Sequence, residues 1–260
     1  MTKHKRIVEH IASCAIIYRE KNPAELLVEK KDSTYPIAAF RNHLSLIGGH
    51  WLGKEAIGDN SPLDTLKREL KEEFSLHSGA HSTKEMKILG SVRKARMYLV
   101  PKKRKNPPPE HEKNLKSLLH FFMKKNIPLG DYLHSLSKKQ FGFPRGNSSV
   151  PYFTTIDSYH IIPVPEKHWQ NLLFLQKIYG NISNESFTRV VSLQNILTKK
   201  MKFIPVHERA LYDFFRHMRV KQWKKFPRGD TIKNKLLGPV RNSYGKYLAD
   251  FEVIAKPSNY

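Results

Sequence analysis

The sequence predicts an α/β domain of the α+β kind, in which short strands of mixed direction pack around a few helices. Apolar runs bounded by turn residues recur along the chain, beginning at residues 11–19 and 25–29. Two segments, 62–74 and 206–218, repeat apolar residues every three or four positions, as helices do. The 260 residues suffice for one core, or for one core with appended segments.

The first three expected strands lie close together in the sequence. Residues 11–19 and 25–29 are apolar enough to be buried, and Lys21-Asn22-Pro23 between them predicts a turn. Residues 44–47 predict a third short strand that ends at Gly48-Gly49. These strands would form the first part of a sheet.

The helix that follows has a well-defined start. Ser61 is a suitable N-cap, Pro62 suits the first helical position, and Asp64 lies three residues after the cap. One apolar stripe then faces the core, formed by Leu63, Leu66, Leu70 and Phe74.

The rest of the chain alternates between expected strands and helices. Residues 86–100 predict a strand or hairpin arm, and residues 101–150 an insertion that leaves the sheet and re-enters it. Within the insertion, the spacing predicts a helix over 115–123 and a further helical turn at 132–136. The remaining expectations are strands at 159–164 and 187–193, an amphipathic helix at 206–218, and a basic segment of weak periodicity at 219–256.

The net charge of +23 exceeds what solubility requires and implies a polyanionic partner, nucleic acid before an acidic membrane face. The charge is concentrated in two places. Residues 101–150 carry 9 Lys and 2 Arg against 3 acids, and residues 199–260 carry 10 Lys and 5 Arg against 5 acids. Their excesses of 8 and 10 leave the rest of the chain close to an ordinary globular composition.

The single cysteine, Cys14, lies in an apolar run, where a buried strand position is expected rather than a reactive thiol. A chain with one cysteine forms no internal disulfide, which suits a reducing compartment. No run approaches the ~18 apolar residues that a membrane helix needs. We therefore expect a soluble protein that is cytoplasmic or otherwise intracellular.

Glycines and carboxylates fall at spacings that suit metal-assisted chemistry on a phosphoanhydride. Glu69, Glu72 and Glu73 stand at i, i+3 and i+4, so one helix face can present all three to a hard divalent cation. The upstream Gly48-Gly49 lets backbone and a diphosphate approach that cation closely. The alternative is an ordinary solvated helix face, because Lys-Arg-Glu-Leu-Lys-Glu-Glu is common helix composition.

This arrangement resembles the Nudix box of Nudix hydrolases, and the resemblance covers residues 49–76. The matching positions are Gly49, Glu55, Arg68, Glu69, Leu70, Lys71, Glu72 and Glu73. The resemblance implies an α/β/α sandwich that cleaves a nucleoside diphosphate linked to another moiety, with Mg²⁺ or Mn²⁺ as cofactor. It implies that Glu69, Glu72, Glu73 and the Gly48 carbonyl bind the metal, and that Arg68 and Glu55 pair to brace the loop.

Two positions depart from the family pattern. Twelve residues separate Glu55 from Arg68 where the family has seven, and Ser75 stands where the family has glycine. Because loop length costs little entropy, we expect residues 56–60 to be removable without loss of the fold. Neither departure removes an expected metal ligand.

The general base is left open by the sequence. Glu72 is a candidate together with Glu166 and Glu185, and His160 is a weaker one, for which a hydrogen-bonded strand histidine is the more ordinary role. His50 follows the glycine pair and would either touch a phosphate or lie as a surface loop residue.

The resemblance implies a Nudix domain over residues 1–218, interrupted by the helical insertion at 101–150 and followed by a basic C-terminal extension at 219–260. Capped or 5′-triphosphorylated RNA is the sharper substrate hypothesis. A small conjugate (dinucleotide polyphosphate, ADP-ribose or NAD-like), a non-catalytic RNA-binding Nudix module and a ribosomal-type structural binder are the alternatives. The expected phosphate or nucleic-acid contacts are Lys102, Lys103, Arg104, Lys105, Lys224, Lys225 and Arg228.

Overall fold

Strand β2 (His10–Arg19) lies at the centre of the fold, and eight of its ten residues are buried. It pairs in parallel with β7 (Tyr152–Val164) over its whole length, and antiparallel with β3 (Asn22–Lys30) and β5 (Ile47–His50). A strand buried on both faces must be apolar throughout, as the run around Cys14 is. Cys14 is buried, as predicted.

The computed structural model describes residues 5–33, 35, 37–51, 53, 59–74, 109–142, 151–179, 187–229 and 232–254. Within these residues, eight strands form one mixed sheet with the central order β4-β3-β2-β7-β6-β9, while β5 pairs with β2 and β8 with β3. The strands not yet bounded are β4 (Leu44–Ser45), β6 (Ile127–Ser137), β8 (Phe187–Ser192) and β9 (Lys233–Gly238).

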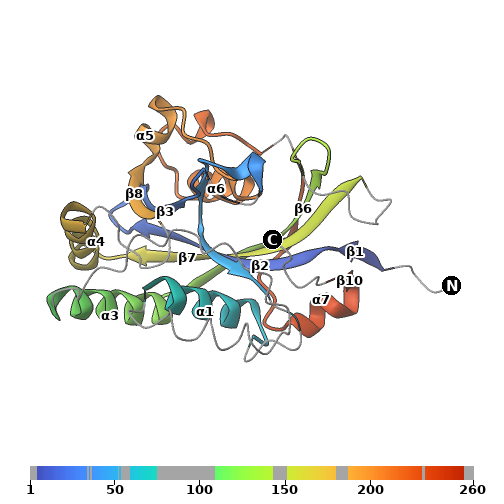
Figure 1. Cartoon of the computed structure of the whole chain (residues 1–260), viewed down its shortest axis with the longest axis horizontal. Coiled ribbons are helices and arrows are strands. Elements are labelled where there is room, and N and C mark those ends of the chain that lie inside the picture. The colour runs from blue at the N-terminus through green and yellow to red at the C-terminus, as the bar shows by residue number, and fades with distance from the viewer. Residues whose placement is uncertain are drawn as a thin grey trace.

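Helices cover both faces of this sheet, as Figure 1 shows. On one face, Ala15 and Ile17 of β2 pack with α1 (Pro62–Phe74), α3 (Pro109–Lys124) and α4 (Glu166–Tyr179). On the other face, Cys14 and Ile16 pack with α5 (Leu193–Thr198) and α6 (Pro205–His217). The predicted α/β class and the α/β/α sandwich are therefore confirmed. None of the helices that the structure describes is long and apolar enough to cross a membrane.

Helix α1 begins as predicted. The Ser61 hydroxyl accepts a hydrogen bond from the Asp64 backbone N–H at 3.2 Å, and Pro62 is the first helical residue. Leu66, Leu70 and Phe74 are buried as expected, but Leu63 is only partly buried and Thr65 takes a core position.

The glycine pair differs from the expectation that it ends a strand. Gly48 and Gly49 lie inside β5, where Gly48 is opposite Cys14 and Gly49 is opposite Ser13. The strand continues through both glycines because β2 supplies hydrogen-bond partners along its length.

The expected helical turn at 132–136 is wrong, because these residues belong to strand β6. β6 pairs antiparallel with β7 on one side and with β9 on the other. Local spacing was compatible with a helix, but hydrogen-bond partners on both sides determine the extended conformation. The expected elements at 11–19, 25–29, 115–123, 159–164, 187–193 and 206–218 are confirmed as β2, β3, α3, β7, β8 and α6.

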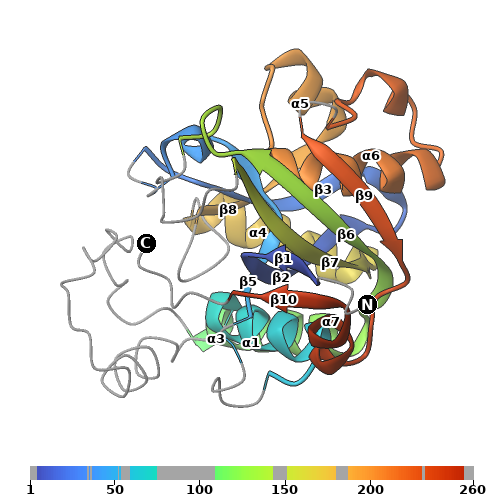
Figure 2. The same ribbon diagram turned by 90° about the vertical axis from the view of Figure 1, so that its right-hand side faces the viewer.

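The C-terminal segment is more ordered than its weak periodicity suggested. β9 forms an edge of the large sheet, and β10 (Phe251–Val253) pairs in parallel with β1 (Arg6–Val8), as Figure 2 shows. Between them, α7 (Tyr244–Asp250) lies near α1. The boundaries at 101–150 and 219–260 stay a prediction, although both segments contribute strands to the same sheet. The expected hairpin arm at 86–100 lies outside the described residues.

Candidate active site

Helix α1 gathers charged side chains around Arg68, where the helix faces strand β5. Arg68 Nη1 lies 2.6 Å from Glu69 Oε1 and 3.2 Å from Glu72 Oε1. Arg68 Nη2 donates to the backbone carbonyl of His50 at 2.8 Å. One guanidinium therefore bridges two of the predicted carboxylates and ties α1 to the end of β5.

Asp59 belongs to this group, although the sequence did not single it out. Its buried carboxylate accepts hydrogen bonds from Arg68 Nε and from Thr65 Oγ1, each at 3.1 Å. Glu55, the expected partner of Arg68, lies outside the described residues. In the sequence, Asp59 is recognisable only as an acid two residues before the Ser61 cap. Acids are common near helix starts for other reasons, so this position did not indicate a pair with Arg68.

Of residues 56–60, which were expected to be removable, the last two make contacts that a looped-out segment would lack, and the others lie outside the described residues. Asp59 is buried and holds Arg68, and its backbone carbonyl accepts from the Trp51 indole at 3.2 Å. The Asn60 carbonyl accepts from the Tyr244 backbone N–H at 3.1 Å, which connects this loop to α7. The loop end is packed rather than looped out.

Both glycines of β5 are required by close contacts. A Cβ added to Gly49 would overlap the Glu69 carboxylate, and a Cβ added to Gly48 would overlap the Ser13 backbone carbonyl. Gly48 also has a φ of 151°, which L-residues with side chains rarely adopt. The Gly49 backbone therefore forms a cradle in which the Glu69 carboxylate lies directly against the strand.

Burial raises the pKa of Glu69 to about 7, and the neighbouring Glu72 carboxylate adds to the rise while Arg68 opposes it. Burial works to lower the pKa of Arg68, but Glu69, Glu72 and Asp59 together raise it further than burial lowers it. Arg68 is thus a fixed cation, and one cation is insufficient to keep Glu69 fully ionised near neutral pH.

Glu73 has a second cation, Lys31, in its surroundings. Lys31 Nζ lies 2.5 Å from Glu29 Oε2. Burial works to lower the pKa of Lys31, whereas Glu29 and, more weakly, Glu73 raise it, so that the net shift is upward. Lys31 therefore attracts Glu73 while Arg68 holds Glu69 and Glu72.

The residues fit a hard divalent cation by their chemistry. Glu69, Glu72, Glu73 and the Gly48 carbonyl offer oxygen atoms only, which suits Mg²⁺ or Mn²⁺. The Glu69 carboxylate lies in the Gly49 cradle, where burial raises its pKa. A bound cation would lower that pKa again, because it favours the ionised carboxylate. Among the described residues, no three His, Cys, Asp or Glu side chains already lie close enough together to share one ion.

The structure separates the candidates for the general base. Glu166 pairs with Arg19 at 2.6 Å, and this hydrogen bond lowers the pKa of Glu166 to about 2, which makes it a weak base. His160 is buried, and neither ring nitrogen has a hydrogen-bond partner in the part of the chain that is described. Burial lowers the pKa of His160 to about 4. Glu185 lies outside the described residues, and Glu72 is the candidate that lies beside the cradle, through its pairing with Arg68.

The predicted cationic contacts are not close to this group in sequence, and three of them can be described. Lys224, Lys225 and Arg228 are exposed. Lys224 Nζ lies 5.9 Å from the centroid of the Trp223 ring, and the Arg228 guanidinium 5.6 Å from that of Tyr212. Lys102, Lys103, Arg104 and Lys105 lie outside the described residues.

A second polar network, on the α6 face of the sheet, was also not expected from the sequence. The Tyr159 hydroxyl lies 3.3 Å from Asp157 Oδ2 and 3.2 Å from His207 Nδ1. His207 Nε2 lies 3.1 Å from the Ser45 hydroxyl. Burial lowers the pKa of His207 to about 3, so its ring is neutral. All four side chains are buried, which fits a role in joining α6 to the sheet.

No family model and no curated protein matches the sequence. Among solved structures, the chain is similar to a mutT/nudix family protein from Listeria innocua, with 13% sequence identity and a TM-score of 0.39. The similarity covers 82% of this chain and 96% of that one. At this identity and TM-score, the likeness carries no weight for fold or function. Nudix membership stays a hypothesis that depends on the residues around α1.

Proposed function

We propose that this protein is a hydrolase of Nudix type, which uses Mg²⁺ or Mn²⁺ to cleave a phosphoanhydride bond in a nucleoside diphosphate linked to another moiety. The observation that carries the proposal is the position of Glu69. Its carboxylate lies against the backbone of Gly49, and burial raises its pKa to about 7. A buried acid beside a second carboxylate is an unfavourable arrangement unless a cation accompanies it.

Each residue around the cradle has a separate role in this proposal. Glu69, Glu72, Glu73 and the Gly48 carbonyl would hold the cation, which when bound supplies a water of lowered pKa and polarises the phosphoryl group. Arg68 keeps Glu69 and Glu72 on one side of α1, and Asp59 keeps Arg68 in place. Glu72, whose side chain is 40% exposed against 18% for Glu69, is accessible for taking a proton from water.

Two substrate classes follow from the chemistry and the charge. Small nucleotide conjugates need only the α1 group. A capped or 5′-triphosphorylated RNA would in addition use the cations that give the chain its charge of +23. We favour RNA, because a small ligand held at α1 does not require the basic residues of segments 101–150 and 199–260.

A non-catalytic RNA-binding protein is the second candidate, and one observation favours it. The Arg68 guanidinium lies between Glu69 and Glu72, within 2.6 and 3.2 Å of their oxygens, where it pairs with both without a metal. In such a protein the carboxylates would stabilise the turn between β5 and α1 and perform no chemistry.

The decisive experiment measures release of phosphate or mononucleotide from a panel of dinucleotide polyphosphates, nucleotide sugars and 5′-triphosphorylated RNA, with and without Mg²⁺. We expect turnover that a chelator removes, and a loss of about 100-fold or more in Glu72→Gln. The matched control is Glu20→Gln, an exposed acid in the turn between β2 and β3. Equal turnover in Glu72→Gln and the control would refute the site. Absence of turnover on every substrate, with RNA binding intact, would support the non-catalytic candidate.

A further inference from the structure

A basic groove lies on the surface formed by β3, β4, β8 and the segment between α5 and α6. Two adjoining pockets share Lys30, Asn42 and Arg189, and together they form this groove. The other residues that line it include Asp32, Arg41, Phe187, Lys200 and Lys202. None of them belongs to α1 or β5, so the groove is separate from the carboxylate group.

Cations dominate the groove. Lys30, Arg41, Arg189, Lys200 and Lys202 line it, and among its described residues Asp32 alone is acidic. Within the described part of the chain, no ion pair involves any of these five cations. Within that part of the chain, no carboxylate lies within ion-pair distance of them.

The pairing of β3 with β8 places three side chains of the groove on one face. Lys30 is directly opposite Phe187 in the ladder, and Arg189 lies two residues further along β8. Alternate residues of a strand, and residues directly opposite each other, point to the same face. The Arg189 Nε atom is buried and has no hydrogen-bond partner among the described residues, which leaves one donor for a ligand.

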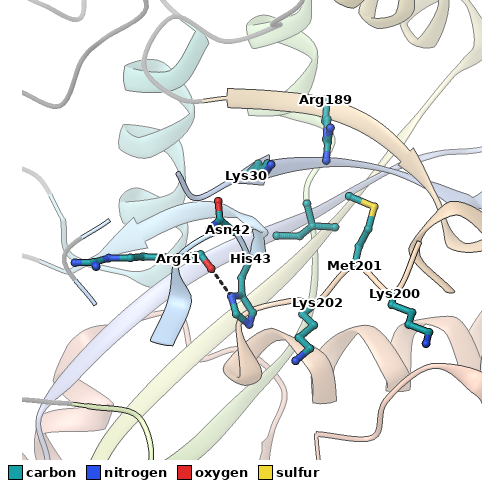
Figure 3. Close-up of a pocket in the computed structure, with 9 residues that line it drawn as sticks. Lys30, Arg41, Asn42, His43, Arg189, Lys200, Met201 and Lys202 are labelled. Atoms are coloured by element: carbon teal, nitrogen blue, oxygen red, sulfur yellow. Dashed lines mark hydrogen bonds between the residues drawn. The ribbon is translucent and has the colours of Figure 1, made fainter. Parts of the chain in front are cut away.

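The directions of the side chains indicate an extended ligand. In Figure 3, Arg41, Lys200 and Lys202 extend outward from the pocket, whereas Met201 lies toward its centre. A single small anion would need donors that converge on one point. Cations distributed around an opening instead suit a chain of phosphates that crosses it.

Phe187 adds a second kind of contact. Its ring is 48% exposed at the start of β8, beside Lys30 and Arg189. Exposed aromatic rings that neighbour cations are the combination by which proteins hold single-stranded nucleic acid, because unpaired bases stack on the ring while phosphates meet the cations. Duplexes keep their bases stacked internally and cannot use Phe187 in this way.

We propose that this groove binds single-stranded RNA, with Lys30, Arg189, Lys200 and Lys202 on the phosphates and Phe187 stacked against a base. The described residues that line it do not include Lys224, Lys225 or Arg228. It goes beyond the proposed hydrolase activity and does not depend on it, because binding requires neither a metal nor Glu72.

The test uses the full chain and a fluorescent single-stranded oligoribonucleotide with a 5′-hydroxyl end, titrated by anisotropy in the presence of a chelator. These conditions exclude hydrolysis, so failure of the hydrolase proposal leaves the result readable. Lys30→Gln combined with Arg189→Gln should weaken binding about tenfold and reduce the slope of log affinity against log salt by about 1.4, or about 0.7 per lost phosphate contact. The matched control is Lys167→Gln with Lys177→Gln, two exposed lysines of α4 on the other face of the sheet.

A second pair of variants tests stacking. Phe187→Ala should weaken binding about fivefold or more. Phe174→Ala, which removes a ring of similar exposure from α4, should leave binding unchanged. Circular dichroism and thermal melting of each variant establish that the fold is intact.

Three outcomes would overturn the proposal. In the first, the Lys30 and Arg189 double variant and its α4 control bind RNA with the same affinity and the same dependence on salt. Another is binding of duplex RNA as tight as single-stranded RNA, with no effect of Phe187→Ala. The third is binding to vesicles of acidic phospholipid that these variants abolish while RNA binding is unchanged, which would make the groove a membrane contact.

Discussion

The α1 face of the sheet holds an enclosed group of paired charges, whereas the face of α5 and α6 holds an exposed groove rich in cations. On the α1 face, Asp59 is buried and only 18% of the Glu69 side chain is exposed, and Arg68 is enclosed with them. On the face of α5 and α6, Lys200 and Lys202 are exposed and without ion pairs in the described part of the chain. The two faces therefore hold charge for different purposes.

This difference follows from the cost of removing charge from water. Exposed lysines keep their hydration and their charge, so they attract a polyanion over a distance without destabilising the fold. Buried carboxylates lose hydration, and each needs a partner held at a fixed position. A face of the first kind suits binding, and a face of the second kind suits chemistry at one point.

The largest expected effect concerns the partner of Arg68. Asp59→Ala removes a buried carboxylate, which leaves the half-buried Arg68 guanidinium without one of its anions and Thr65 without this acceptor. Breaking a buried pair typically costs 3–5 kcal/mol, so we expect the melting temperature to fall by about 10 °C. The control is Arg209→Gln, which breaks a pair with Asp213 on α6 whose arginine is 36% exposed. A change of about 2 °C or less is expected there. Equal losses would remove the distinction between the faces.

A smaller loss of stability should follow when the cradle is filled. Gly49→Ala puts a methyl group where the Glu69 carboxylate lies, so the carboxylate must move. Overpacking of this kind costs 1–3 kcal/mol, or about 5 °C in melting temperature, and hydrolysis should fall with it. Gly245→Ala is the comparison, because the added Cβ on α7 would meet only the Ser243 hydroxyl, at 3.3 Å. Turnover and melting temperature unchanged in Gly49→Ala would show that the cradle has no role.

The smallest expected effect is the dependence of stability on pH, where the two faces offer a matched pair. Burial raises the pKa of both Glu69 and Glu208 from 4.5 to about 7. Between these values the folded state holds protons that the unfolded state has lost, so stability falls as pH rises from about 4.5 to about 7. The melting temperature therefore decreases over this range of pH. Glu69→Gln and Glu208→Gln should each reduce this decrease by on the order of 3 °C.

Mg²⁺ should affect the melting temperature through Glu69 and not through Glu208. If the cation binds ionised Glu69, it raises the melting temperature more above about pH 7 than below about pH 5, because protonated Glu69 does not bind it. Glu69→Gln should remove that gain, and Glu208→Gln should keep it. Melting curves with and without Mg²⁺ at the two pH values measure this difference. A gain that both variants retain would place the metal elsewhere.

Several elements were predictable because their causes are local. The start of α1 depends on Ser61, Pro62 and Asp64, which act on neighbouring backbone groups. The central strands were predictable because a strand buried on both faces must be apolar along its whole length. The carboxylates on α1 share one side of the helix because of the helical repeat, which is a property of spacing alone.

Other elements depend on partners that are distant in the sequence. Residues 132–136 are a strand only because β7 and β9 lie on either side of them. The role of Asp59 requires Arg68 to reach back across the loop, nine residues along the chain. The groove requires Lys30, Arg189 and Lys202 to meet from three different segments.

The sequence by itself thus determined the fold class, the basic charge, the capped helix and the order of its acids, since each follows from composition or from contacts within a few residues. Only the tertiary structure decided which charges are buried together and which remain in water. Burial and pairing depend on long-range packing, and they alone set the pKa of Glu69 and the availability of Lys30 and Arg189.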